Sequence, residues 1–283
     1  MEHNQKGWIG GLIFILVLVS VPVWYFTRSA DAEPGQVVDT PWEHMPRRAA
    51  HVDHKDLFSG PFETGQQVTQ SCLECHEDAG EQVIHTAHWR WQADPVQMEG
   101  RDEPVSVGKK NAINNFCIGI QGNWAACTAC HAGYGWEDEN FDFENTANVD
   151  CLVCHDNSGG YRKSKKGLPA EGVDLLAAAK SVGLPTRQNC GGCHFRGGGG
   201  NAVKPGDQAE SLYYPDDNLD VHTGRYDFQC IDCHQTKDHV IGGRALTVSV
   251  DNANQIACTD CHSSKLHADA RINAHTPTVA CQT

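Results

Sequence analysis

Apolar residues are concentrated in one stretch close to the start of the chain. The stretch runs from Trp8 to Phe26, with Lys6 before it and Arg28 after it. Its length, about 20 residues, is just enough for a helix to cross a bilayer core and is long for the apolar part of a signal peptide. Ala30-Asp31-Ala32 resembles a cleavage site, so a membrane anchor and a cleaved signal peptide both stay open for residues 1–32. In either case the pattern predicts that everything beyond it is exported to the periplasmic side.

No long amphipathic or alternating pattern dominates the remaining residues, 33–283. Short helices are predicted from Val173 to Ser181 and around the cysteine motifs described below. The run from Gly197 to Gly200 predicts a loop, and the segment from Pro205 to Pro215 is expected to be irregular. So little patterned apolar surface cannot build a large core. We therefore expect a mainly α domain with extensive loops that is built around something other than its own side chains.

The sequence Cys-x-x-Cys-His occurs six times in the 283 residues. This pentapeptide is the attachment signature of c-type haem, in which two thiols bind the porphyrin and the histidine coordinates the iron. Six haem c groups, held in one haem-cored domain, would supply the missing apolar bulk. The copies are Cys72-Cys75-His76, Cys127-Cys130-His131, Cys151-Cys154-His155, Cys190-Cys193-His194, Cys230-Cys233-His234 and Cys258-Cys261-His262.

Other uses of paired cysteines fit the pattern poorly. A disulfide framework needs no histidine behind every second cysteine, a zinc site draws ligands from separate clusters, and a redox motif occurs once. Two cysteines lie outside the six motifs, Cys117 and Cys281. Cys281-Gln282-Thr283 reads as the beginning of a seventh motif, so we expect an N-terminal fragment of a longer cytochrome; an ordinary cysteine near a natural end is the alternative.

The net charge of the chain is −14. An acidic surface argues against a nucleic-acid partner and fits a redox protein whose electron donor presents complementary charge. A small anionic substrate would need a local positive pocket, because the field of the whole protein repels it.

The second axial ligand of each iron decides between electron transfer and catalysis. Two imidazoles leave no room for a substrate, whereas an open or weakly held position permits chemistry. Histidines outside the motifs are numerous enough for mostly bis-histidine ligation. His44, His51 and His85 are weaker candidates, since each has a neighbour that could serve instead. The favoured second ligands are His54, His88, His222, His239, His267 and His275.

Several segments between the motifs resemble the octahaem tetrathionate reductase family of c-type cytochromes. The likeness covers almost the whole exported region. It is carried by the segments His54 to Phe62, His88-Trp89-Arg90-Trp91, Asn114 to Trp124, Cys193-His194-Phe195 with the glycines that follow, Asp220-Val221-His222, and Asn273-Ala274-His275 leading into Val279 to Thr283.

The resemblance implies eight haems, of which the second along the chain is catalytic and has a lysine as distal ligand. Lys163 is the matching candidate ligand for the iron bound by His131, and Lys109 or Lys110 are alternatives. The other interpretation is that Lys163 belongs to an ordinary basic run on the solvated surface. An amine must lose its proton to bind iron, and burial beside a metal favours this. Cys117 is either a small buried residue or a neighbour of the catalytic pocket. One departure is Pro205, which cannot coordinate iron where the family tends to carry a histidine.

The sequence thus predicts a periplasm-facing reductase. Electrons would come from a quinol oxidiser or a small cytochrome, and tetrathionate, nitrite or hydroxylamine are the substrates that the resemblance implies. A membrane-anchored cytochrome that only transfers electrons is the alternative from another class. An oxidative enzyme related to hydroxylamine oxidation is a third.

Overall fold

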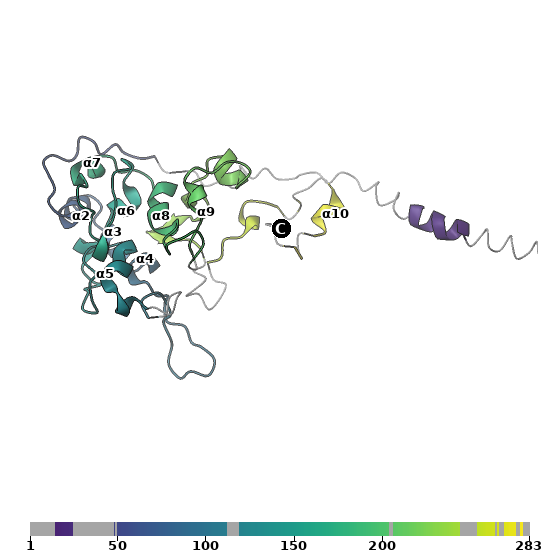
Figure 1. The fold of residues 1–283 in the computed structure, drawn as a ribbon, viewed down its shortest axis with the longest axis horizontal. Helices are drawn as coiled ribbons and strands as arrows, with labels where there is room; N and C mark the ends of the chain where they lie inside the picture. The colour runs from purple at the N-terminus through teal and green to yellow at the C-terminus, as the bar shows by residue number, and fades with distance from the viewer. Residues whose placement is uncertain are drawn as a thin grey trace, which may run out of the picture. The chain divides into compact units, whose positions relative to one another are not determined.

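The computed structural model describes residues 15–24, 48, 50–111, 119–203, 206–243, 254–263, 265, 269–275 and 278–279. Contacts divide the chain into two units (Figure 1). One contains residues 46–256 and the first five motifs, and the other contains residues 1–45 and 257–283. We describe each unit by itself.

The larger unit consists of short helices joined by long loops, as the sequence predicts. None of the helices in its described part exceeds nine residues. One small antiparallel hairpin, β1 (Thr236–Lys237) with β2 (Val240–Ile241), was not predicted, because two-residue strands leave no pattern to read. The helices are α2 (Gly65–Leu73), α3 (Ala79–Ile84), α4 (Ala87–Arg90), α5 (Trp124–Cys127), α6 (Leu152–His155), α7 (Leu175–Lys180), α8 (Arg187–His194) and α9 (Cys230–Cys233).

Single turns of other helix types fill part of the loops. The segment from Pro205 to Pro215 contains one such turn, Glu210–Tyr213, so it is more ordered than the sequence suggested. A π-helical turn spans Val221–Arg225. The remaining 3-10 turns of this unit are Ile120–Gly122, Thr128–Cys130, Thr146–Asn148 and Lys165–Gly167.

Side-chain caps explain where several helices begin. Helix α7 lies within the predicted range 173–181 and starts after Asp174, whose carboxylate accepts a hydrogen bond from the backbone N–H of Ala177 at 2.9 Å. Helix α2 starts after Thr64 with a reciprocal capping box to Gln67. Such caps satisfy backbone N–H groups that a helix leaves open at its beginning. The cysteine motifs lie in or at the ends of helices, so a helical turn holds the two thiols of a motif on one side.

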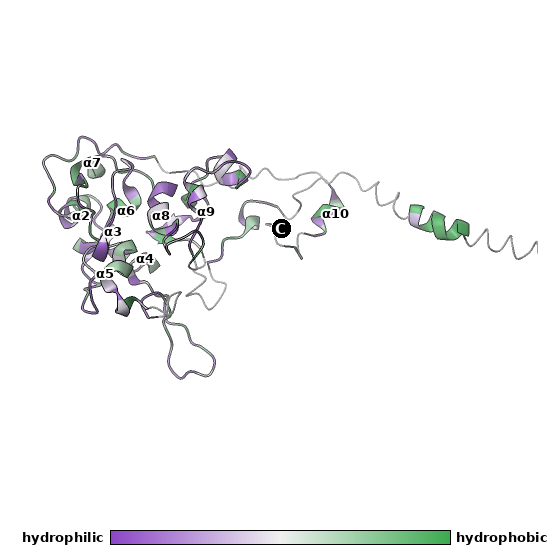
Figure 2. Cartoon of the chain, in the orientation of Figure 1, coloured by the Kyte–Doolittle hydropathy of each residue, from purple (hydrophilic) through white to green (hydrophobic). Residues whose placement is uncertain are grey.

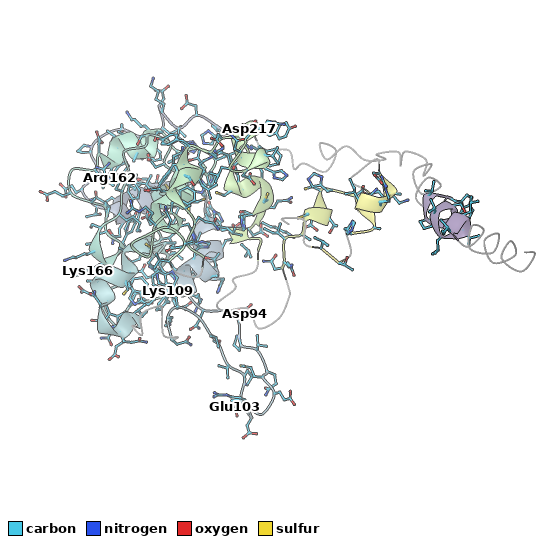
Figure 3. The ribbon with its side chains drawn as sticks, turned by 45° about the vertical axis from the view of Figure 1, so that its right-hand side comes forward. Asp94, Glu103, Lys109, Arg162, Lys166 and Asp217 are labelled. Atoms are coloured by element: carbon cyan, nitrogen blue, oxygen red, sulfur yellow. The ribbon has the colours of Figure 1, made fainter. Side chains whose placement is uncertain are left out.

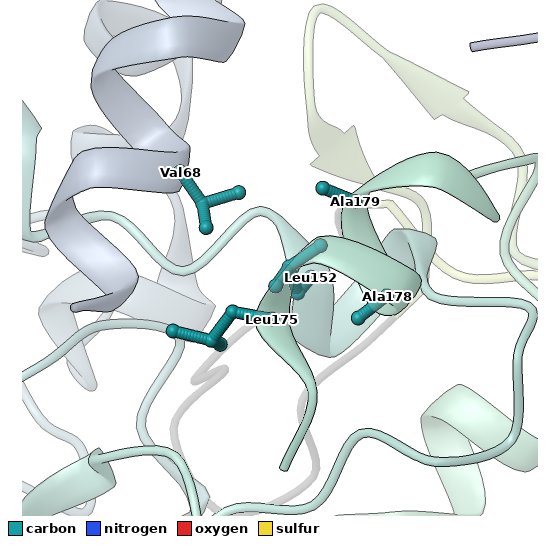
Figure 4. Packing of buried hydrophobic residues seen from close by; sticks show 5 residues of the cluster. All are labelled: Val68, Leu152, Leu175, Ala178 and Ala179. Carbon is teal, nitrogen blue, oxygen red and sulfur yellow. The ribbon is translucent and has the colours of Figure 1, made fainter. Parts of the chain in front are cut away.

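The apolar core of this unit is small. Figure 4 shows its first cluster, in which Val68 of α2 and Leu152 of α6 pack against α7 through Leu175, Ala178 and Ala179. Two further clusters contain Trp89 and Trp136 as their largest buried side chains. Clusters of this size agree with the prediction that side chains alone provide little core.

A long loop extends from the body of this unit and returns to it (Figure 3). Asp94 and Glu103 lie on the loop, and Lys109 lies where it returns. Val96 and Val105 pair in an antiparallel bridge near its base.

The smaller unit is described only in part. Residues 15–24 are helical and apolar throughout most of their length (Figure 2), and two short turns follow in the C-terminal segment, Cys258–Asp260 and α10 (Ala270–Asn273). Within the described ranges, no helix is both long enough and apolar enough to span a membrane. His44, Cys117, His267 and Cys281 lie outside the described residues, and the predictions made for them stay predictions.

Candidate functional site

Cysteines of different motifs meet in the larger unit. The thiol of Cys72 lies beside that of Cys151, and the thiol of Cys190 lies beside that of Cys230. A third pair joins Cys130 to Cys193. Porphyrins attached to such neighbouring thiols must themselves be neighbours. The contacts therefore connect the first motif with the third, the second with the fourth, and the fourth with the fifth.

Three motif histidines share one arrangement. The Nδ1 atoms of His155, His194 and His234 are bonded to the carbonyl oxygens of Gly183 (2.9 Å), Gly206 (3.2 Å) and Gly242 (2.8 Å). A carbonyl can only accept, so each Nδ1 carries the proton and each Nε2 keeps its lone pair for a metal. A hydrogen bond that holds Nδ1–H and leaves Nε2 unprotonated is what an iron-binding histidine requires, and these residues fit haem ligation.

Three of the predicted second ligands lie opposite motif histidines. The ring centres of His54 and His76 are 6.1 Å apart, those of His88 and His194 are 6.1 Å apart, and those of His155 and His239 are 6.5 Å apart. Metal–imidazole bonds of about 2.0 Å place two rings on opposite sides of one metal at about 6.3 Å between centres. The three separations therefore fit bis-histidine pairs at the first, fourth and third motifs.

For three of these histidines, His88, His155 and His239, the pKa lies below its ordinary value, which favours the neutral ring. Solvent reaches part of the His88 ring, but burial among surrounding atoms, with His194 and His234 nearby, lowers its pKa to about 4. Burial also lowers the pKa of His155 and of His239. Neutral imidazole is the form that binds a metal.

Two other predicted ligands, His222 and His275, lie in the described part of the chain. The ring of His222 packs against Phe228 with centres 5.6 Å apart, and His275 is exposed at the end of α10. Among the weaker candidates, the ring centre of His51 lies 5.2 Å from that of His54. The exposed side chain of His85 contacts the carboxylate of Glu81.

His131 differs from the other motif histidines. Its side chain is completely buried, and its Nε2 is bonded to the carbonyl oxygen of Trp89 at 2.7 Å. The Nδ1 has no hydrogen-bond partner of normal geometry within the described part of the chain, although the Gly133 backbone is close enough to favour a protonated ring. Burial, opposed by the bond to Trp89, lowers the pKa of His131 to about 3, and the charges of Lys163 and Lys109 add to this. The nitrogen expected on iron is thus engaged by a backbone oxygen.

Aromatic rings surround His131 on several sides and form what we call the aromatic box. Their centres lie between 4.8 and 6.2 Å from that of His131. The box consists of Trp89, Trp91, Trp136, Phe141 and Phe143.

Lys163 lies beside this box in a buried polar network. Its Nζ donates to the carbonyl oxygen of Gly133 at 3.2 Å and to the carboxylate of Asp150. The hydroxyls of Tyr134 and Tyr161 donate to the same carboxylate at 2.9 and 2.7 Å. Burial raises the pKa of both tyrosines, so they stay protonated as donors. The structure thus brings Lys163 and His131 to one residue, Gly133: its carbonyl accepts from Lys163, and a Cβ at this position would lie 3.0 Å from Cε1 of His131.

Two more lysines contact the aromatic box. Lys109 Nζ lies 4.0 Å from the ring centre of Trp91, and Lys110 Nζ lies 4.0 Å from that of Phe143. Burial lowers the pKa of Lys110, and the charge of Arg90 lowers it further. These two lysines place positive charge beside the aromatic box in a chain whose net charge is −14.

Sequence reasoning missed three parts of this site. Asp150 precedes the third motif directly, and Tyr134 follows the second by three positions; their closeness to the motifs was the available signal. Trp89 was named in the sequence analysis only as part of a segment that resembles the family. A Trp or Asp in a loop cannot be told from a surface residue until the chain is folded.

The chain has the fold of a multihaem c-type cytochrome, and haem c is its prosthetic group. The neighbour that shows this is the crystal structure of an octahaem cytochrome c from Shewanella oneidensis, with a TM-score of 0.72 and 46% identity over 82% of this chain. The match covers 52% of that chain, so the present chain spans about half its length. A protein of Archaeoglobus fulgidus described only as uncharacterized is 25% identical over 246 residues, 69% of this chain and 82% of that protein. No family model matches. The likeness shows the fold of a multihaem cytochrome c over most of this chain.

Proposed function

We propose that the chain belongs to a periplasmic reductase in which the haem at Cys127 and Cys130 is catalytic and the others deliver electrons. The observation that carries the proposal is the environment of His131. His155, His194 and His234 are anchored through Nδ1 and leave Nε2 for iron. In His131 it is the Nε2 that is hydrogen-bonded, to the carbonyl oxygen of Trp89. A catalytic haem needs an axial position that a substrate can take. Among the motif histidines of residues 46–256, His131 is the one for which a bond between Nε2 and a backbone carbonyl oxygen is described.

Lys163 is the proposed additional ligand at this site. Its amine must lose a proton before it can bind a metal, and Asp150 is already its hydrogen-bond partner. The proton would pass between these two side chains, and the tyrosine hydroxyls would continue to satisfy the carboxylate. A substrate that displaced the amine would let the proton return to Lys163, so that Lys163 and Asp150 would hold and release one proton at Nζ.

Contacts between thiols support a relay. Cys72 with Cys151 joins the first and third motifs, and Cys154 lies within electrostatic reach of Cys190 and Cys193 of the fourth. From the fourth motif, Cys193 reaches Cys130 of the second. Electrons that enter at the first motif would reach the catalytic haem through the third and fourth.

Tetrathionate, nitrite and hydroxylamine are the proposed substrates, in line with the resemblance to octahaem tetrathionate reductases. Lys109 and Lys110, which contact the aromatic box, supply the local positive charge that an anion needs in an acidic protein. We propose a quinol oxidiser or a small cytochrome as electron donor, an electrostatically complementary partner for this acidic chain. Haem attachment outside the cytoplasmic membrane agrees with the predicted export.

The test is a spectroscopic titration of the full-length, haem-loaded protein with hydroxylamine and with nitrite. We expect one haem to bind the added ligand and change its spin state, and we expect Lys163→Ala to alter that haem. Lys165→Ala is the matched control, because Lys165 is exposed in the same basic run. Unaltered spectra of every haem in both titrations would refute the catalytic proposal.

Electron transfer without catalysis is the second candidate function. It is favoured by the three histidine pairs, which leave no axial position for a substrate at the first, third and fourth motifs. It predicts that Lys163→Ala changes neither the haem spectra nor any turnover.

A further inference from the structure

The ring of His239 is held by a side chain from a distant part of the sequence. Its Nδ1 is bonded to the Oε1 of Gln82 at 2.8 Å, and 157 positions separate the two residues. Gln82 lies in α3 and is half-buried, and His239 lies in the turn between β1 and β2 with a left-handed backbone (φ 63°). A left-handed backbone is uncommon outside glycine, and histidine is among the residues that adopt it more often than most. The hydrogen bond to Gln82 therefore holds the His239 ring in an orientation that the backbone of the turn alone does not determine.

This arrangement differs from that of other predicted iron ligands. His155, His194 and His234 bond through Nδ1 to glycine carbonyls, and His54 bonds in the same way to the carbonyl of Val52 at 2.7 Å. A backbone carbonyl is the same acceptor whatever residue carries it. At His239 the acceptor is a side-chain amide, so its strength is encoded by residue 82.

We propose that Gln82 is a positioning residue that sets the orientation and donor strength of His239, and through it the reduction potential of the haem attached at Cys151 and Cys154. The inference rests on the proposed axial pair of His155 and His239. An acceptor on Nδ1–H raises the basicity of the opposite nitrogen, which stabilises oxidised iron, and it fixes the plane of the ring. A neutral amide gives an intermediate effect that substitution can strengthen or remove.

Because of where this haem is attached, its reduction potential would affect electron flow along the proposed relay. Cys151 contacts Cys72 of the first motif, and Cys154 lies near Cys190 and Cys193 of the fourth. The third haem is therefore the junction between the first motif and the rest of the proposed relay. A change of its potential alters the flow of electrons through that junction.

Two substitutions in the haem-loaded protein test the inference in opposite directions. Gln82→Glu supplies a stronger acceptor of nearly the same shape, and we expect the potential of one haem to fall. Gln82→Leu removes the acceptor, and we expect the potential of the same haem to rise and its low-spin electron paramagnetic resonance signal to move as the ring turns. Glu81→Gln is the control for charge alone, because Glu81 neighbours Gln82 in α3 and is exposed.

Two results would overturn the inference. One is that the potentials and the resonance signals are unaltered in both Gln82 variants. The other is that Glu81→Gln shifts the reduction potential of the same haem by as much as Gln82→Glu does, in the opposite direction. A general effect of charge would give that result. If Gln82→Leu fails to fold, the nearly isosteric Gln82→Glu still decides.

A further variant separates this inference from the proposals on which it rests. His239→Ala should turn one haem from low-spin six-coordinate to high-spin. If it does so while the Gln82 variants change nothing, the ligand pair holds and the role of Gln82 fails. If it changes nothing, the ligand pair itself fails. Neither result depends on the second haem, whose catalytic role is tested by the hydroxylamine and nitrite titrations.

Discussion

The ammonium of Lys163 donates a hydrogen bond to the carboxylate of Asp150, and both side chains are almost completely buried, at 6% and 0% exposure. A buried charge is costly unless it is paired and its remaining hydrogen-bonding sites are filled. Here Tyr134, Tyr161 and the backbone N–H of Val153 complete the carboxylate, and the carbonyl of Gly133 accepts from the ammonium. The network joins the second and third motifs through their loops, so it serves stability as well as the proposed chemistry.

Removal of one partner from this network should be strongly destabilising. Asp150→Asn breaks a buried network, because Lys163, Tyr134 and Tyr161 lose the carboxylate to which they are bonded, and we expect a loss of about 3–5 kcal/mol in the free energy of unfolding. Denaturant unfolding of the haem-loaded protein, followed by circular dichroism, measures it. Glu137→Gln is the control, because it breaks the exposed pair with Lys166 and should cost less than about 1 kcal/mol. Equal losses in the two variants would contradict the structural role of Asp150.

The tyrosines of the same network predict how stability depends on alkaline pH. Burial raises the folded-state pKa of Tyr134 and Tyr161, and the negative charge of Asp150 acts in the same direction. Above about pH 10 the unfolded chain loses these protons while the folded chain keeps them, so stability falls as pH rises, by up to about 1.4 kcal/mol per pH unit for each group. Unfolding at several pH values from 9 to 11 measures the slope. Tyr161→Phe should flatten it, and an unchanged slope would show that this phenol ionises freely.

How much of this site follows from the sequence depends on the kind of residue. The attachment cysteines could be placed because their spacing is itself the signal. His54, His88 and His239 were selected by counting spare histidines, but their pairing with particular motifs needed the fold, since His239 meets a motif 84 positions away. Lys163 was placed near His131 by resemblance alone. Asp150 could not be found, because a lone aspartate before a motif has no period or spacing that separates it from the acidic surface.

The lysines on the aromatic box predict a difference between charged and neutral ligands. Lys110→Gln and Lys109→Gln each remove a positive charge near His131 and should weaken nitrite binding by about 1 kcal/mol, or roughly fivefold. Hydroxylamine is neutral at pH 7, so its binding should change much less. Parallel spectroscopic titrations measure both ligands. Lys165→Gln, in an exposed position, is the control. Similar losses for the two ligands would point to distortion of the box instead of lost charge.

Haem should be required for the fold of residues 46–256. The apolar clusters of this unit are small, and the first of them contains only Val68, Leu152, Leu175 and two alanines as buried members. Burial of apolar area is worth about 25 cal/mol per Å², and such clusters cannot offset a chain entropy of about 1–2 kcal/mol per ordered residue. Porphyrins held between the motif helices would add the missing apolar contact. The chain produced in the cytoplasm, where haem is not attached, should therefore lack a cooperative unfolding transition and exchange its amide hydrogens rapidly. The exported, haem-loaded chain should show both a transition and protected amides in α2, α6 and α7. A haem-free chain with the same protected helices would mean that the side chains alone suffice.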